Sequence, residues 1–106
     1  MNAAIRAVLS ALKDRLRCLY GQRLRGLYLF GSFARDEADA ESDMDVLIVL
    51  DRVDDYAQEI GLTSPIMSEL SLECGHSISC VFVSEARWGQ DQTMFLLNVR
   101  EEAIRA

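Results

Sequence analysis

The sequence feature that most restricts the fold is a pair of acidic residues that leads directly into a buried strand. Residues 46–50, Val-Leu-Ile-Val-Leu, form the longest uninterrupted apolar run of the chain, and a strand that is apolar on both faces belongs in the interior of a sheet. Asp43 and Asp45 stand at its start. Because side chains at positions i and i+2 of a strand share a face, the two carboxylates point the same way. The fold therefore has to place two like charges side by side at the edge of its core.

A divalent cation would resolve this conflict. Two ionised carboxylates within a few ångströms repel, and without compensation one of them would take up a proton. Oxygen ligands select hard ions, so we expect Asp43 and Asp45 to bind Mg²⁺ or Mn²⁺. The alternative is a solvated strand end, because six of the ten residues from 36 to 45 are acidic. Haloacid-dehalogenase-type phosphatases and many glycosyltransferases also use a D-x-D pair, but they place it after the apolar strand.

A Gly-Ser turn follows an earlier apolar strand, ten residues before the acidic pair. Gly31 allows a backbone conformation closed to other residues and a close approach of a ligand to the main chain. Ser32 adds a hydroxyl donor, and a helical turn beginning at Phe33 would direct free N–H groups toward an anion. Alone, Gly-Ser fits an ordinary turn. Opposite two metal-binding carboxylates, it predicts chemistry on a nucleoside triphosphate.

The pattern of apolar residues predicts a small α+β (α/β two-layer) fold. Helical spacing and strand-like runs predict a helix over 2–20, strands over 24–30, 44–50 and 78–83, a mainly helical segment over 54–75 and a last helix over 93–105. Thr63-Ser64-Pro65 interrupts the middle segment, which leaves one helix or two. This order predicts one domain over residues 1–106, a small mixed β-sheet with helices packed on it.

Composition excludes several classes of function. The formal net charge of -6 argues against direct nucleic-acid binding and against binding to an acidic membrane surface. No apolar run approaches the roughly 20 residues of a membrane-spanning helix. The three cysteines have no C-x-x-C spacing, so we expect reduced thiols and a cytoplasmic protein. The sequence leaves self-association into a homo-oligomer open.

The segment "FGSFARDEADAESDMDVLIVL", residues 30–50, resembles the signature of the DNA polymerase β-type nucleotidyltransferase superfamily. That signature is G-S, ten residues and D-x-D. The chain most resembles the minimal nucleotidyltransferases, single-domain bacterial and archaeal proteins of about this length, and the resemblance covers essentially the whole chain. It implies a polymerase beta-like nucleotidyltransferase core.

The resemblance also implies roles for individual residues. Gly31 and Ser32 would hold the triphosphate of ATP, and Asp43 and Asp45 would bind the metal ions. Arg35 occupies the position of a frequent family arginine, so a phosphate contact is implied, with an ordinary ion pair to the acidic loop as the alternative. Directly before the acidic pair, Ser42 can hydrogen-bond the entry loop, and it is a further nucleotide-binding candidate.

Family members commonly act as the antitoxin of a two-gene module whose other half is a helical HEPN ribonuclease toxin. Characterised members transfer AMP from ATP to a tyrosine of that toxin. The resemblance therefore implies a protein adenylyltransferase with ATP and a HEPN-family toxin as partners.

Two departures from the family pattern keep a second hypothesis open. Asp36 stands where members often have Gly, and residues 76–83 contain no acid, although active enzymes usually carry a third carboxylate on that strand. Ser77 or Ser79 would occupy its face. His76 is either a base or ligand at the site or a loop residue. The alternative to an active enzyme is a binding module that neutralises its partner by contact, and a partner protein that supplies the missing acid is a third possibility.

Overall fold

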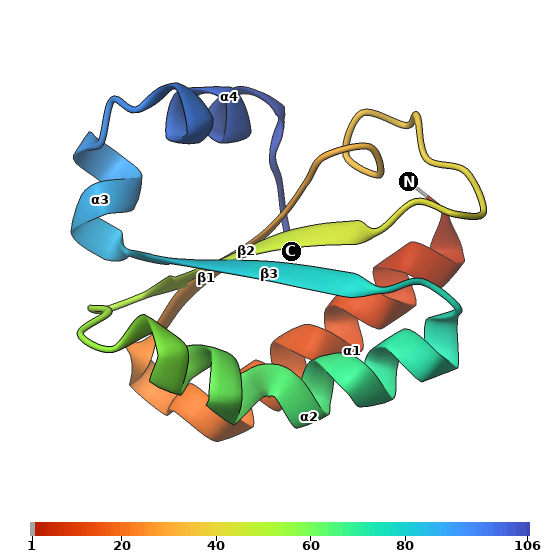
Figure 1. Ribbon diagram of the computed structural model, residues 1–106, viewed down its shortest axis with the longest axis horizontal. Helices are drawn as coiled ribbons and strands as arrows, with labels where there is room; N and C mark the ends of the chain where they lie inside the picture. The colour runs from red at the N-terminus through yellow and green to blue at the C-terminus, as the bar shows by residue number, and fades with distance from the viewer. Residues whose placement is uncertain (1) are drawn as a thin grey trace.

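The computed structural model describes residues 2–106 and contains a four-stranded mixed sheet (Figure 1). Its strands lie in the order β3-β2-β1-β4. The β2 strand runs antiparallel to β1 and parallel to β3, and β4 runs antiparallel to β1. The strands are β1 (Leu24–Phe30), β2 (Met44–Leu50), β3 (Ile78–Ser84) and β4 (Ile104–Arg105). The α+β class and the interior position of the apolar strand after the acidic pair are confirmed.

Helices lie on both sides of this sheet. In Figure 1 α1 and α2 run beneath the sheet, whereas α3 and α4 lie above it. The helices are α1 (Ala3–Tyr20), the short 3-10 helix η1 (Gly21–Arg23), α2 (Tyr56–Cys74), α3 (Glu85–Gln90) and α4 (Met94–Glu102). Within residues 2–106, none of them combines the length and apolar character needed to cross a bilayer.

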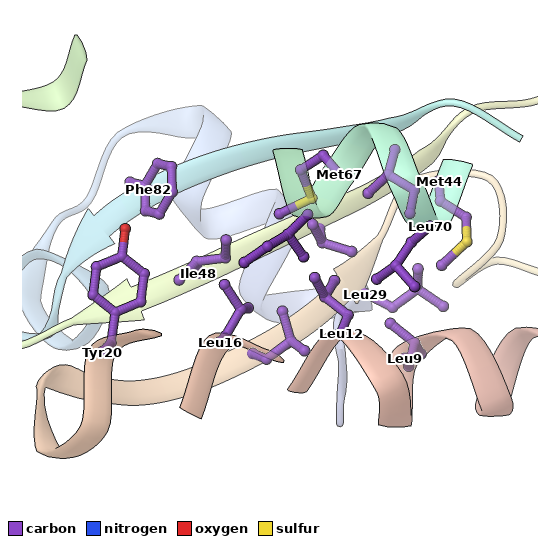
Figure 2. Close-up of a cluster of buried hydrophobic side chains, with 14 of the residues drawn as sticks. Leu9, Leu12, Leu16, Tyr20, Leu29, Met44, Ile48, Met67, Leu70 and Phe82 are labelled. Atoms are coloured by element: carbon purple, nitrogen blue, oxygen red, sulfur yellow. The ribbon is translucent and has the colours of Figure 1, made fainter. Parts of the chain in front are cut away.

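The first helix forms because one of its sides is continuously apolar. Asn2 caps its N-terminus by accepting the N–H of Ile5, and Gly21 ends it at a φ of 58°. Its buried side chains recur every three or four residues: Ile5, Leu9, Leu12, Leu16 and Tyr20. In Figure 2 four of them, Leu9, Leu12, Leu16 and Tyr20, point toward residues of the sheet and of α2. Their burial fixes α1 under the sheet.

Alternation along β2 decides on which face the acidic pair lies. The even-numbered side chains are buried in the cluster that faces α1 and α2: Met44, Val46, Ile48 and Leu50. Leu47 and Val49 point to the opposite face and pack in a second apolar cluster with side chains of β3 and α4. Asp45 shares the face of Leu47. The candidate site therefore lies on the α4 side of the sheet.

The helical segment in the middle of the chain is one helix, because α2 continues through Pro65. Proline in a helix interior costs about 3 kcal/mol, since it removes one backbone hydrogen bond and crowds the preceding turn. The hydroxyls of Thr63 and Ser64 satisfy nearby carbonyls of the same helix at 2.9 and 2.8 Å. Thr63, Ile66 and Met67 are buried, so packing of this segment holds the helix together.

The last helix is shorter than the sequence pattern predicts. The α4 helix ends at Glu102, Ala103 is extended, and Ile104–Arg105 pairs with β1 as β4. The backbone N–H of Ala106 also donates to Leu27 O at 2.9 Å. These bonds satisfy backbone groups at the free edge of β1, which explains why the chain leaves the helix there.

One buried carboxylate joins α1, η1 and α2. Glu59 is 5% exposed. It accepts a hydrogen bond from the Tyr20 hydroxyl at 3.1 Å and another from Arg23 Nη2 at 2.9 Å. Burial, together with the neighbouring Glu59, raises the pKa of Tyr20 well above its ordinary value. Because removal of one partner of a buried ionic group leaves the others unsatisfied, this network stabilises the end of the molecule away from the acidic pair.

We expect Glu59→Ala to lower the free energy of unfolding by about 1–3 kcal/mol, because Tyr20 and Arg23 lose their common acceptor. Urea unfolding followed by circular dichroism measures the change. The matched control is Glu69→Ala, which breaks an exposed ion pair to Arg15 and should cost less than about 1 kcal/mol. Equal losses of unfolding free energy in the two variants would show that the buried network contributes no more to stability than an exposed ion pair.

Candidate active site

A cleft opens where β1 ends, β2 begins and the C-terminal part of α4 crosses above them. Its volume is about 610 Å³. Three of the residues predicted from the sequence to bind a nucleotide lie on its wall, together with one of the two predicted metal ligands. The lining residues are Phe30, Gly31, Ser32, Arg35, Asp45, Phe95, Asn98, Val99, Glu101 and Glu102.

The Gly-Ser turn is tight and begins a single helical turn, as the sequence predicts. The N–H of Arg35 donates to Gly31 O at 3.1 Å, and the N–H of Glu37 donates to Ser32 O at 2.9 Å. Gly31 has a φ of 77°, and a Cβ built on it would collide with the carboxylate of Asp45. Only glycine adopts this φ freely and also lacks the Cβ that would collide with Asp45. The backbone of the turn and the acid of the next strand are therefore in direct contact.

Asp36 closes the helical turn in a left-handed conformation, with a φ of 58°. It is the one residue other than glycine with a positive φ in the part of the chain that the structure describes. Such a conformation costs an L-residue roughly 1–2 kcal/mol, whereas glycine adopts it freely. This backbone requirement explains a preference for glycine here, and Asp is one of the few other residues that tolerate the conformation.

The negative charges of Asp43 and Asp45 are not fully compensated by nearby positive charge. Asp45 is half-buried and Asp43 is exposed. Burial raises the pKa of Asp45, the charge of Asp43 raises it further, and Arg35 opposes the effect. Within residues 2–106 no cluster of three metal-ligating side chains forms. Two carboxylates of this kind suit Mg²⁺, which usually keeps water and phosphate oxygens as its other ligands.

The strand next to the acidic pair has a serine where a third acid would stand. In the parallel pairing of β2 and β3, Asp45 is opposite Ser79, so the two side chains share a face. Ser77 lies before the strand, and its carbonyl accepts the N–H of Met44 at 2.8 Å. Of the two serines that the sequence left open, the structure places Ser79 beside the acid.

Arg35 is held by two carboxylates. Its Nε donates to Glu37 at 3.1 Å and its Nη1 donates to Glu102 Oε2 at 3.0 Å. The other oxygen of Glu102 accepts the backbone N–H of Gly31 at 3.1 Å. Hydrogen bonding by Arg35 lowers the pKa of Glu102. Glu102 lies 71 positions from Gly31 at the end of a helix, so no local pattern in the sequence indicates it. The phosphate contact of Arg35 stays a prediction.

Ser42 and His76 do not line the cleft. The Ser42 hydroxyl accepts the N–H of Asp39 at 2.9 Å within the acidic loop. His76 Nδ1 lies 2.9 Å from Ser42 O, and it must carry the proton there because a carbonyl oxygen only accepts. The histidine ring also packs edge-on against Phe33, with the ring centroids 5.0 Å apart. His76 thus anchors the loop, and the role of Ser42 in nucleotide binding stays a prediction.

Comparison with known proteins reveals related sequences and folds. Residues 18–96 match the family described as "Polymerase beta, Nucleotidyltransferase". A protein of Methanocaldococcus jannaschii named "Putative protein adenylyltransferase" is 34% identical over 100 residues, which cover 93% of this chain and 90% of the relative.

Two solved structures share the fold. A toxin-antitoxin crystal structure with AMP-PNP has a TM-score of 0.63 at 17% identity, over 89% of this chain and 68% of that chain. A nucleotidyltransferase from Sulfolobus solfataricus, itself described as putative, has a TM-score of 0.59 at 16% identity, over 99% of this chain and 86% of that chain.

We expect Asp45→Asn to raise the melting temperature at neutral pH in the absence of divalent cations. The folded state raises the pKa of Asp45, so its ionised form costs stability once the pH exceeds the ordinary value near 4. The gain should disappear on acidification below that value, where Asp45 is protonated in both states. Thermal unfolding at several pH values, with and without Mg²⁺, measures it.

The matched variant is Asp43→Asn at the exposed position of the pair, which should change the melting temperature less. Added Mg²⁺ should stabilise the wild type and leave Asp45→Asn nearly unchanged. A lower melting temperature for Asp45→Asn at neutral pH would contradict the claim that the ionised Asp45 carboxylate destabilises the folded state.

Proposed function

The chain belongs to the polymerase beta nucleotidyltransferase family, and we propose that it transfers AMP from ATP to a hydroxyl group of a partner protein. The observation that carries the proposal is the single cleft that joins the Gly31-Ser32 turn to Asp45. The relative named as a protein adenylyltransferase supports the reaction. The toxin-antitoxin structure with AMP-PNP supports the kind of partner.

Four residues that line the cleft, together with the neighbouring Asp43, have a part in this proposal. The N–H of Gly31 and the hydroxyl of Ser32 bind the triphosphate, and Arg35 contributes a positive charge. Asp43 and Asp45 would hold Mg²⁺ or Mn²⁺, and the bound ion would neutralise negative charge on phosphate oxygens. The acceptor hydroxyl gives up its proton to solvent as its oxygen attacks the α-phosphorus, the bond to the bridging oxygen of the β-phosphate breaks, and pyrophosphate leaves.

The partner we propose is a HEPN-family toxin, and the acceptor is one of its tyrosines. No part of residues 2–106 lies outside the sheet and its packed helices as a separate substrate domain. In this proposal the partner presents the acceptor hydroxyl to the cleft. AMP on the toxin would inactivate it, and this chain would act as the antitoxin.

A second candidate function is a binding module that neutralises its partner by contact alone. The specific observation in its favour is Ser79, an uncharged side chain beside Asp45 where active enzymes of the superfamily usually carry an acid. A hydroxyl is a poor replacement for a charged metal ligand. The retained pair of carboxylates favours the enzyme, because a protein that only binds has little physical reason to keep two repelling charges.

Labelled ATP distinguishes the two functions. With Mg²⁺ and the HEPN-family product of a neighbouring gene, we expect AMP to appear on a tyrosine of that product. Asp43→Asn and Asp45→Asn should each reduce the rate by about a hundredfold or more, as should chelation of the metal. Asp54→Asn, an exposed carboxylate away from the cleft, serves as the control. Tight binding and suppressed toxicity without any transfer would leave only the binding module.

Ser79→Asp tests the missing acid directly. A carboxylate at this position would stand beside Asp45 on the same face, so we expect tighter Mn²⁺ binding and an increase in transfer of about tenfold or more. Ser68→Asp, an exposed position on α2 away from the cleft, is the matched control. If Mn²⁺ affinity and rate stay unchanged in Ser79→Asp, the absence of a third acid is not what limits the reaction.

A further inference from the structure

We propose that Glu102 occupies the phosphate subsite of the free protein and that a triphosphate must displace it. This inference rests on the proposed function, because it concerns the same cleft. Glu102 binds the backbone N–H of Gly31 and the guanidinium of Arg35. These are two of the donors assigned above to the triphosphate. One anion from the chain therefore stands where the anion of the substrate would bind.

The contact is bidentate and comes from a distant part of the chain. Glu102 Oε1 lies 3.1 Å from Gly31 N, and Glu102 Oε2 lies 3.0 Å from Arg35 Nη1. Each oxygen thus takes one donor, in the way that two oxygens of a phosphate group would. The Glu102 side chain is 25% exposed, so water and solutes reach it. Its position inside the cleft makes it a competitor for these donors.

The location of Glu102 along α4 is unfavourable apart from this contact. Glu102 is the last residue of α4, where the helix dipole disfavours negative charge. The cleft itself is acidic, because Asp45, Glu101 and Glu102 line it with Arg35 as the one basic residue among its lining side chains. The ion pair with Arg35 and the bond from Gly31 offset these costs. A more highly charged anion that brings its own divalent cation can replace Glu102 at the same donors.

Glu102 is on the wrong side of Asp45 to serve as the missing third acid. In the sheet order β3-β2-β1-β4, the third acid would stand on β3. Glu102 instead contacts the turn that follows β1 and lies two residues before β4. The two positions flank β2 from opposite sides. This placement sets Glu102 against the two phosphate donors, Gly31 N–H and the Arg35 guanidinium.

The backbone around Glu102 does not need to move for the carboxylate to leave. Ala103 is extended, Ile104 is paired with Leu29, and the N–H of Ala106 bonds Leu27 O. These contacts hold the C-terminal segment on β1. Rotation of the Glu102 side chain alone frees both donors, so displacement costs about the value of one partly exposed ion pair and one hydrogen bond.

Binding of inorganic triphosphate with Mg²⁺, measured by isothermal titration calorimetry, tests this competition. Glu102→Gln removes the charge with little change of shape, and Glu102→Ala removes the contact altogether. Triphosphate must displace both a partly exposed ion pair and a hydrogen bond in the wild type, and an occupied site weakens apparent affinity in proportion. We therefore expect both variants to bind triphosphate about three- to tenfold more tightly. The alanine variant should show at least the gain of the glutamine variant.

The matched control is Glu101→Gln, which removes the same charge from the lining of the cleft. Glu101 makes no hydrogen bond to Gly31 or Arg35. The triphosphate affinity of Glu101→Gln should therefore differ from that of the wild type by about twofold or less. Circular dichroism verifies that each variant is folded. An equal gain in Glu101→Gln would mean that net charge explains the effect, and the inference would be overturned.

The remaining outcomes separate the inference from the proposed function. Weaker or unchanged binding in both Glu102 variants, with normal binding by the wild type, would make Glu102 a positioning residue for Gly31 and Arg35. That result overturns the competition and leaves the nucleotidyltransferase intact. If the wild type and both variants fail to bind triphosphate, the phosphate subsite itself is absent, and the proposed function fails with it.

Discussion

The contact between Gly31 and Asp45 is the constraint on which the candidate site depends. Antiparallel pairing places Phe30 opposite Asp45 at the ends of β1 and β2, so the turn after β1 meets the first acid of β2. The space for a Cβ on Gly31 is already occupied by that carboxylate. A backbone N–H and a negative charge are thereby held together at the wall of one cleft. Triphosphate and metal chemistry need this combination.

The electrostatics of the cleft leave its carboxylates without an equal amount of positive charge. Asp43 and Asp45 repel each other, and the Arg35 guanidinium is shared between Glu37 and Glu102. The chain therefore has no surplus of positive charge with which to receive a triphosphate. In the proposed reaction, a divalent cation bound with the nucleotide would supply that charge. The same balance explains why the free protein can keep a carboxylate of its own against Gly31 and Arg35.

Most of the fold was predictable because β1, β2 and β3 each carry a strong local signal. The bounds of β1 and β2 were predicted without error, since both are apolar runs that end at a glycine turn or begin at the acidic pair. Two elements were not. Pro65 lies inside α2 because burial of its neighbours outweighs the local penalty. The expected helix to residue 105 ends at Glu102, because the free edge of β1 takes up the chain as β4.

What the sequence by itself determined is the local chemistry: a Gly-Ser turn, two carboxylates on one face of a strand, and the absence of an acid from the next strand. Spacing along a strand decides these, because side-chain direction has a period of two. Only the tertiary structure decided that Ser79 is the residue opposite Asp45, that Ser42 turns into the acidic loop, and that Glu102 reaches Gly31. Strand register and the packing of α4 bring these groups together from distant parts of the chain, and no pattern of neighbouring residues records such contacts.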